Sequence, residues 1–105
     1  MELKIYWTDF SKKQLRKIFS FYHENASLRV AQKLTIGIVE KTFIVSTRPK
    51  AGQKEELLKD RKQEFRYLVF KNYKIIYWIN YLKNQVEISD IFDTRQNPTK
   101  MEQND

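Results

Sequence analysis

The stretch FRYLVFKNYKIIYWINYLKNQVEISDIF, residues 65–92, decides the fold of this chain. It contains three short runs of aromatic and β-branched residues, a composition typical of strands. These runs are residues 65–70, 73–81 and 86–92. Lys71-Asn72 fits a two-residue hairpin turn in which Asn takes a positive φ, and Lys83-Asn84 fits a second tight connection. We therefore expect an antiparallel meander whose apolar middle strand is covered on both faces.

An amphipathic helix is predicted upstream of this meander. Its apolar residues recur at spacings of three and four, which places them on one helical face. They are Leu15, Ile18, Phe19 and Tyr22. Thr8 and Asp9 offer an N-cap, and Ser11 with Gln14 offers a capping box one half-turn later.

A second helix follows after a short joint, with Asn25 or Ser27 as its cap. Its apolar stripe has the same spacing and consists of Ala31, Leu34, Ile38, Thr42 and Val45. Gly37 inside the helix indicates close packing, and Arg48-Pro49 ends it because Pro cannot continue the hydrogen-bond ladder. Two helices with so short a connection predict an antiparallel helical hairpin.

The opening run Glu2 to Trp7 predicts one further strand, which must join the edge of the sheet because a lone strand is unstable. The order is then β-α-α-β-β-β, a two-layer α+β fold in which a meander sheet packs against a helical hairpin. The segment 49–62 is the only long irregular stretch, with one helical turn near Glu55 to Leu58. We expect a single domain over residues 1–100 and a frayed polar tail over 101–105.

Composition narrows the classes of function. The chain has 105 residues and no cysteine, so neither a disulfide framework nor a thiolate metal site is expected, and no cofactor is implied. No stretch has the length and apolarity of a signal peptide or a membrane span, which predicts a cytoplasmic protein that does not bind membranes. A net charge of +7 favours an anionic partner such as RNA, DNA or an acidic peptide.

Several local patterns resemble the toxins of the RelE/ParE superfamily of bacterial type II toxin–antitoxin systems, and ParE-like members most closely. The patterns are Ile5-Tyr6-Trp7-Thr8 before the first helical stripe, Pro49-x-x-Gly52, Phe65-Arg66-Tyr67-Leu68, Tyr73-x-Ile75-x-Tyr77, and the ending Thr94-Arg95-Gln96-Asn97-Pro98. The resemblance covers about residues 3 to 100. It implies a plasmid-stabilisation type of growth inhibitor that a cognate antitoxin holds silent. RelE-like members cut messenger RNA in the ribosome, whereas ParE-like members poison DNA gyrase.

Cleavage of RNA by its own 2′-hydroxyl needs a base, an acid and cations that stabilise the phosphorane. Arg66 and Arg95 fall where RelE-like nucleases carry their phosphate-clamping arginines, and Glu64 is a candidate base. Further cations for phosphate or target binding precede the strand and are Lys59, Arg61 and Lys62. No metal would be required.

Each of these residues also has a structural interpretation. Arg66 can pair with a carboxylate beneath the sheet, and Arg95 can fix the C-terminal turn through Asp90 or Asp93. Glu64 can pair with a lysine at the strand edge, and the loop lysines can form a solvated face.

The segment 93–105 lacks the Tyr or His–Tyr pair that RelE-like nucleases carry after the last strand, and the single histidine, His23, lies at the far end of the first helix. This favours the gyrase-directed, non-enzymatic interpretation. The alternatives are a ribosome-dependent mRNA endoribonuclease and a binding module without toxicity.

Five aromatic residues of the meander could stack nucleobases if they faced outward, but we expect most of them in the core. They are Tyr67, Tyr73, Tyr77, Trp78 and Tyr81. The resemblance also implies an acidic, amphipathic antitoxin segment, which would contact the basic residues of the first helix. These are Lys12, Lys13, Arg16 and Lys17, whose alternative role is to keep the helix soluble. A homodimer or a toxin–antitoxin hetero-oligomer is compatible with this reading.

Overall fold

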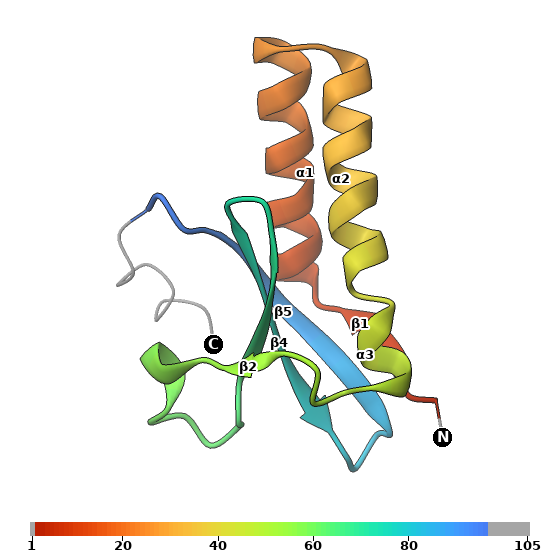
Figure 1. Cartoon of the computed structure of the whole chain (residues 1–105), viewed down its shortest axis with the longest axis vertical. Helices are drawn as coiled ribbons and strands as arrows, with labels where there is room; N and C mark the ends of the chain where they lie inside the picture. The colour runs from red at the N-terminus through yellow and green to blue at the C-terminus, as the bar shows by residue number, and fades with distance from the viewer. Residues whose placement is uncertain (1, 97–105) are drawn as a thin grey trace.

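The structure is a computed structural model that describes residues 2–96 (Figure 1). The elements follow in the order β1 (Lys4–Trp7), α1 (Asp9–Asn25), α2 (Leu28–Lys41), α3 (Ile44–Thr47), β2 (Gln53–Lys54), the 3-10 helix η1 (Glu56–Leu58), β3 (Arg66–Phe70), β4 (Tyr73–Asn80) and β5 (Gln85–Asp93). The predicted two-layer α+β architecture is confirmed. The expected tail over 101–105, and Asn97 and Pro98 of the closing pattern, lie outside the described residues.

The five strands form one mixed sheet in the order β1-β5-β4-β3-β2. The meander β3-β4-β5 is antiparallel, as predicted, and β4 is central. The first strand does take an edge, where it pairs in parallel with β5. A bulge lies on β5, because Ile76 faces Asp90 whereas the next residue, Tyr77, faces Ile88. The bulge changes the phase of the strand, so that Ile88 and Ile91 both reach the same core.

The helical hairpin covers one face of the sheet and builds the main core. Its fully buried members include Ile38 from α2, Tyr77 from β4 and Ile88 from β5. The other face carries a smaller cluster in which η1 and the loop after it cover Ile76 and Phe92. Figure 1 shows that the distal halves of α1 and α2 extend beyond the sheet. Apolar residues on those halves therefore lack a layer to cover them.

Thr8 is the residue that caps α1: its Oγ1 accepts a hydrogen bond from the Ser11 amide at 3.1 Å. The capping box beginning at Ser11 does not form, because Ser11 is buried inside the helix and donates to the Thr8 carbonyl. Ser27 caps α2, whereas the Asn25 side chain bonds the Phe21 carbonyl at the end of α1.

The second helix is shorter than the sequence predicts. The expected stripe ran through Thr42 and Val45, but α2 ends at Lys41 and Val45 lies in α3. The Thr42 hydroxyl donates to the Val39 carbonyl at 2.6 Å, and this local bond competes with the helical ladder. Arg48 consequently follows α3 rather than α2.

The segment 49–62 is less irregular than predicted, because it contains the short strand β2 beside β3. The expected helical turn is confirmed as η1. The hairpin between β3 and β4 also differs: the residue with positive φ is Lys71, at 54°, and not Asn72. Asn72 is held by the end of β5 instead, since its carbonyl accepts from the Thr94 amide and its side chain donates to Asp93.

None of the helices in the described residues has the length and apolarity that crossing a bilayer requires.

Candidate functional site

Arg66, a candidate phosphate ligand, is engaged in structural contacts at the start of β3. Its Nη1 donates to the Gly52 carbonyl at 2.8 Å, and its Nη2 pairs with Glu64 at 2.9 Å. Only 12% of its side chain is exposed. The guanidinium therefore fastens the Pro49–Gly52 turn to the sheet, with a neighbouring carboxylate as counter-ion.

Glu64, the candidate base, lies between two cations. It contacts Arg66 and, at 3.5 Å, the Nζ of Lys54. Desolvation alone would raise the pKa of Glu64, but the charges and hydrogen bonds of Lys54 and Arg66 outweigh it and hold that pKa below its ordinary value. A carboxylate with a lowered pKa is a weaker base, so this environment does not favour proton abstraction.

Tyr77 and Gly52 make the same turn rigid. The buried Tyr77 hydroxyl donates to the Pro49 carbonyl at 2.7 Å and accepts from the Gly52 amide at 2.8 Å. A side chain at Gly52 would place its Cβ 2.6 Å from both the Tyr67 carbonyl and the Tyr77 hydroxyl. The Pro49-x-x-Gly52 pattern thus has a structural reason.

Arg95 forms a forked ion pair with Asp93. Its Nε lies 3.0 Å and its Nη2 2.8 Å from the two Asp93 oxygens. The Arg95 side-chain bonds are the main cause that lowers the pKa of Asp93 from 3.8 to about 2. Of the two carboxylates considered from the sequence, Asp93 is the one that bonds Arg95.

The structure separates Arg66 from Arg95. Arg66 pairs with Tyr77, whereas Arg95 follows Asp93, which pairs with Tyr73 four residues earlier on β4. Four strand residues span about 13 Å of backbone, and each guanidinium is paired with its own carboxylate, Arg66 with Glu64 and Arg95 with Asp93. The other candidate cations do gather with Glu64 around a shallow hollow of about 270 Å³ beside η1. They are Lys59, Arg61 and Lys62.

Two grooves lie beneath the helical hairpin, one on each side of the β3–β4 turn. The first, of about 510 Å³, runs between α1 and the end of β5, and its lining includes Lys17, Phe21, Tyr73 and Arg95. The second, of about 810 Å³, lies between α2 and the β3–β4 turn.

The second groove has an apolar floor and a basic rim. Its floor and wall are formed by Tyr22, Val30, Leu34, Ile36, Gly37 and Phe70. A Cβ on Gly37 would lie 2.3 Å from Cζ of Phe70, so the glycine lets this ring reach the helix. Arg29, Lys33 and Lys71 stand on the rim with a single carboxylate, Glu40.

Sequence reasoning missed this groove, although a signal was present. Val30 and Ile36 lie outside the core stripe of α2, and they are 44% and 55% exposed. Exposed apolar residues that lie outside the core-facing stripe of an amphipathic helix indicate a second contact surface.

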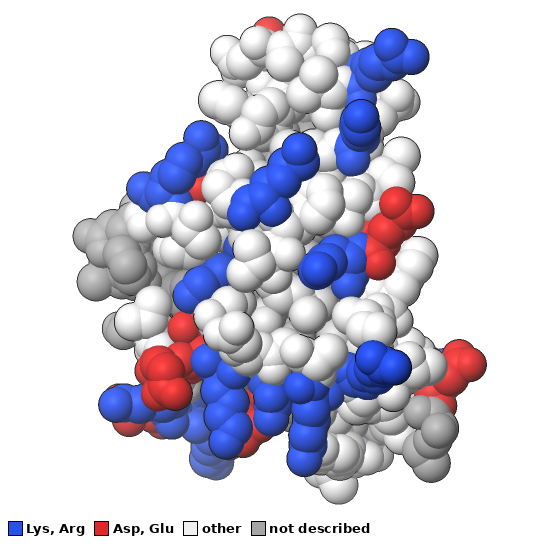
Figure 2. Space-filling view, viewed as in Figure 1, with Lys and Arg blue, Asp and Glu red and all other residues white. Residues whose placement is uncertain are grey.

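The predicted antitoxin contacts on α1 are all exposed, but they are spread around the helix. Lys12, Lys13 and Arg16 line neither groove, whereas Lys17 borders the first one. Figure 2 shows Lys and Arg both along the helices and gathered at the lower end of the molecule.

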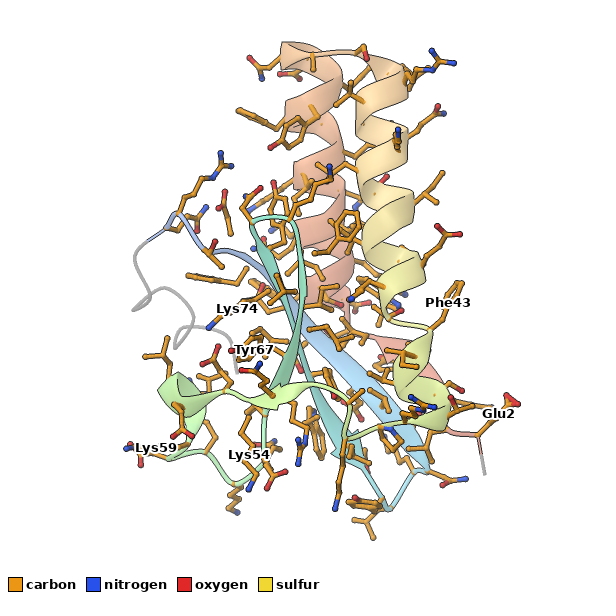
Figure 3. All side chains as sticks on the ribbon, in the orientation of Figure 1. Glu2, Phe43, Lys54, Lys59, Tyr67 and Lys74 are labelled. Atoms are coloured by element: carbon orange, nitrogen blue, oxygen red, sulfur yellow. The ribbon has the colours of Figure 1, made fainter. Side chains whose placement is uncertain are left out.

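The aromatic residues of the meander divide between core and surface. Tyr73 and Tyr77 are buried, and burial is the main cause that raises the pKa of each hydroxyl. Tyr67 and Trp78 pack partly against the smaller cluster, whereas Tyr81 is 68% exposed. The Lys74 Nζ lies 4.3 Å from the Tyr67 ring centroid and pairs with Glu55 at 2.9 Å (Figure 3).

No metal site is evident among residues 2–96, where no group of three or more His, Cys, Asp or Glu side chains has a suitable arrangement. His23 is exposed and its ring lies 5.8 Å from that of Phe19. It is remote from Arg66 and Glu64, which are at the other end of the molecule.

Comparison with known proteins places the chain in a family. No curated protein sequence matches it significantly. A chain of the structure described as "Chromosomal ParDE TA system from P. aeruginosa" has the same fold, with a TM-score of 0.71 and 17% identity over 88% of this chain and 96% of that chain. The profile of the family described as "ParE toxin of type II toxin-antitoxin system, parDE" matches residues 5–98. The chain therefore belongs to the ParE toxin family of type II toxin–antitoxin systems.

Proposed function

We propose that this toxin inhibits growth by acting on DNA gyrase, and that a cognate antitoxin silences it by laying an acidic, amphipathic segment into the grooves under the helical hairpin. The observation that carries the antitoxin part is the apolar groove between α2 and the β3–β4 turn, with its basic rim.

The groove suits such a segment for two physical reasons. Val30 and Ile36 are about half exposed in the free chain, so a partner that covers them gains the free energy of burying apolar surface. The cations Arg29, Lys33 and Lys71 attract acidic side chains and raise the association rate. A chain that alternates apolar and acidic residues satisfies both requirements.

The basic residues of α1 extend this attraction beyond the grooves. Lys17 borders the first groove, and Lys12, Lys13 and Arg16 continue the positive field along the same helix. We expect them to accelerate association more than they stabilise the complex, because exposed ion pairs contribute little affinity.

Gyrase is the favoured target for two reasons. The family is that of ParE toxins, and the ParE-like members are the ones expected to act on gyrase. The residues that RNA cleavage would use are engaged elsewhere: Arg66 and Glu64 bind one another, and Arg95 binds Asp93 about 13 Å away along the sheet.

Pulse labelling in bacteria that express the chain alone tests the target. We expect thymidine incorporation to fall within minutes and before methionine incorporation, and purified gyrase to lose supercoiling activity when the chain is added. An early fall in methionine incorporation would instead identify an RNA-cutting toxin, and Glu64, Arg66 and Arg95 would then be the residues to substitute.

A matched pair of variants tests the groove. Ile36 and Phe43 are 55% and 59% exposed, but only Ile36 lines the groove, whereas Phe43 points away from it (Figure 3). We expect Ile36→Asp to weaken binding of the cognate antitoxin about 30-fold, as for a residue worth about 2 kcal/mol, and Phe43→Asp to leave affinity unchanged. Equal effects of the two variants would exclude the groove.

The basic face of α1 needs its own test. Replacing Lys12, Lys13, Arg16 and Lys17 by Glu should slow antitoxin association at low salt and reduce its salt dependence. Unchanged association and affinity would remove this face from the interface.

A further inference from the structure

The lower end of the molecule carries a second hollow, remote from both grooves. It measures about 510 Å³ and is lined by Lys50, Lys62, Gln63, Glu64, Trp78, Ile79 and Tyr81. We call this surface the basic end. It lies beside the β4–β5 turn, whereas the grooves flank the β3–β4 turn at the other end of β4. The eight residues of β4 separate the two by roughly 23 Å.

The basic end has an excess of unpaired positive charge. Its carboxylate, Glu64, is matched by Lys54 and Arg66 at 3.5 and 2.9 Å. No ion pair or side-chain hydrogen bond engages the ammonium groups of Lys50 and Lys62 within residues 2–96. Figure 2 shows Lys and Arg gathered at this lower end, and Figure 3 places Lys54 and Lys59 there.

Glu87, on the neighbouring strand β5, forms no ion pair with a lysine among the described residues. Glu87 pairs with Trp78 across the strands and accepts hydrogen bonds from the amides of Asn80 and Gln85 at 2.7 and 2.9 Å. Because these two amide groups donate to the Glu87 carboxylate, it does not neutralise the lysines of the basic end.

Two aromatic side chains stand beside these cations. Tyr81 is 68% exposed in the β4–β5 turn, and no hydrogen bond of its hydroxyl is found in the described part of the chain. Trp78 packs one side against the smaller cluster and lines the hollow with the other. The Tyr81 ring thus lines the same hollow as Lys50 and Lys62 and is available for contacts with a partner.

We propose that the basic end binds single-stranded nucleic acid. Lysine ammonium groups neutralise phosphates, and aromatic rings provide planes on which unpaired bases stack regardless of sequence. A duplex keeps its bases stacked inside, so it can use the lysines but not the rings. An acidic peptide can likewise use the lysines, but it has no planar groups that would favour Trp78 and Tyr81.

This site lies apart from the two grooves proposed for the antitoxin. Its distance from the grooves means that an antitoxin seated under the helical hairpin leaves Lys50, Lys62 and Tyr81 accessible. Nucleic-acid binding is therefore expected of both the free toxin and the toxin–antitoxin complex.

Fluorescence anisotropy with the full chain tests the proposal. The probes are labelled single-stranded RNA and DNA of about 12 nucleotides, with a duplex of the same length for comparison. The test variant is Lys50→Glu with Lys62→Glu, and the matched control is Lys12→Glu with Lys13→Glu on α1. Each pair lowers the net charge by four, from +7 to +3. Circular dichroism verifies that both variants fold.

We expect the single strands to bind more tightly than the duplex. The variant at the basic end should lose about tenfold or more in affinity, and the control at most about threefold. Tyr81→Ala, at an exposed position that cannot disturb the core, should weaken single-strand binding about fivefold and leave duplex binding unchanged. Tryptophan fluorescence should fall on binding, because a base stacks on Trp78.

Four results would overturn the proposal. Equal losses of affinity in the two charge variants would show that binding depends on net charge and not on the position of the lysines. A duplex that binds as tightly as the single strands, or Tyr81→Ala without effect, would exclude base stacking. Competition by polyglutamate as strong as by an unlabelled single strand would assign the surface to acidic proteins instead.

Discussion

The substitution Tyr77→Phe removes one buried hydroxyl, and we expect it to destabilise the fold by more than the loss of a single hydrogen bond. Tyr77 is fully buried, and its hydroxyl closes two hydrogen bonds to the Pro49–Gly52 turn, at 2.7 and 2.8 Å. The substitution keeps the ring in the core and deletes only the polar atom. It therefore isolates the contribution of the turn.

The magnitude follows from the groups that are left behind. Each lost hydrogen bond costs about 1 kcal/mol net, and the Gly52 amide, which is itself buried, adds about 1 kcal/mol or more once it has no acceptor. The expected loss is about 3 kcal/mol. For a domain near this size, 1 kcal/mol lowers the melting temperature by about 4 °C, so a fall of roughly 12 °C is expected.

Differential scanning calorimetry and urea unfolding of the purified chain measure this loss. Tyr67→Phe is the matched control, because its hydroxyl donates to the exposed Gln53 side chain at 2.9 Å. That control should change the unfolding free energy by no more than about 0.5 kcal/mol. If Tyr77→Phe also cost less than about 0.5 kcal/mol, the hydroxyl would not be what fixes the turn, and the structural reading of Pro49-x-x-Gly52 would fail.

Three further substitutions test other parts of the fold, each by urea unfolding. Thr8→Ala should cost about 2 kcal/mol, because Thr8 caps α1 and also donates to the Ile88 carbonyl of β5 at 3.1 Å; a loss of only a few tenths would contradict this. Gly37→Ala should destabilise the chain by about 1 kcal/mol despite the better helix propensity of Ala, since its Cβ would displace the Phe70 ring; a stabilised variant would show that the ring moves freely. The pKa of Asp93 is lowered to about 2, so the stability that it contributes is present above pH 4 and lost as the pH falls toward 2. The free-energy difference between the natural chain and Asp93→Asn should shrink over that interval, and a difference that is constant with pH would refute the linkage.

The elements that the sequence predicted well are those with a repeated local pattern. Three of the four residues of the first helical stripe, Leu15, Ile18 and Tyr22, pack against the core because their spacing matches the helical repeat, whereas Phe19 lies beside the exposed His23. The apolar run of β4 is central because both its faces are covered. In contrast, β2 has only two residues, too few for any alternation to be visible. At the end of α2, the Thr42 hydroxyl bonds to the Val39 carbonyl and not to solvent, because Thr42 is buried in the tertiary structure. This burial is not visible in the local sequence.

The grooves could not be predicted from spacing, because they depend on where the sheet ends relative to the helices. Val30 and Ile36 are ordinary helical residues in the sequence, and they become a surface only because α2 extends beyond the sheet and the β3–β4 turn stands beside it. A helical stripe predicts which residues face a layer, but not whether the layer continues under them.

Arg66 shows why a candidate catalytic residue remains ambiguous in a sequence. The planar donors that suit a guanidinium to a phosphate suit it equally to a carboxylate and a peptide carbonyl, and here Glu64 and Gly52 supply those acceptors. A phosphate at this position would have to displace both, and the displaced carboxylate would then repel it. The same reasoning applies to Arg95 with Asp93. Within residues 2–96, Lys50 and Lys62 face no such competition, so these two lysines are better placed than Arg66 to meet a polyanion. Of the two, the sequence had indicated only Lys62 as a candidate phosphate ligand.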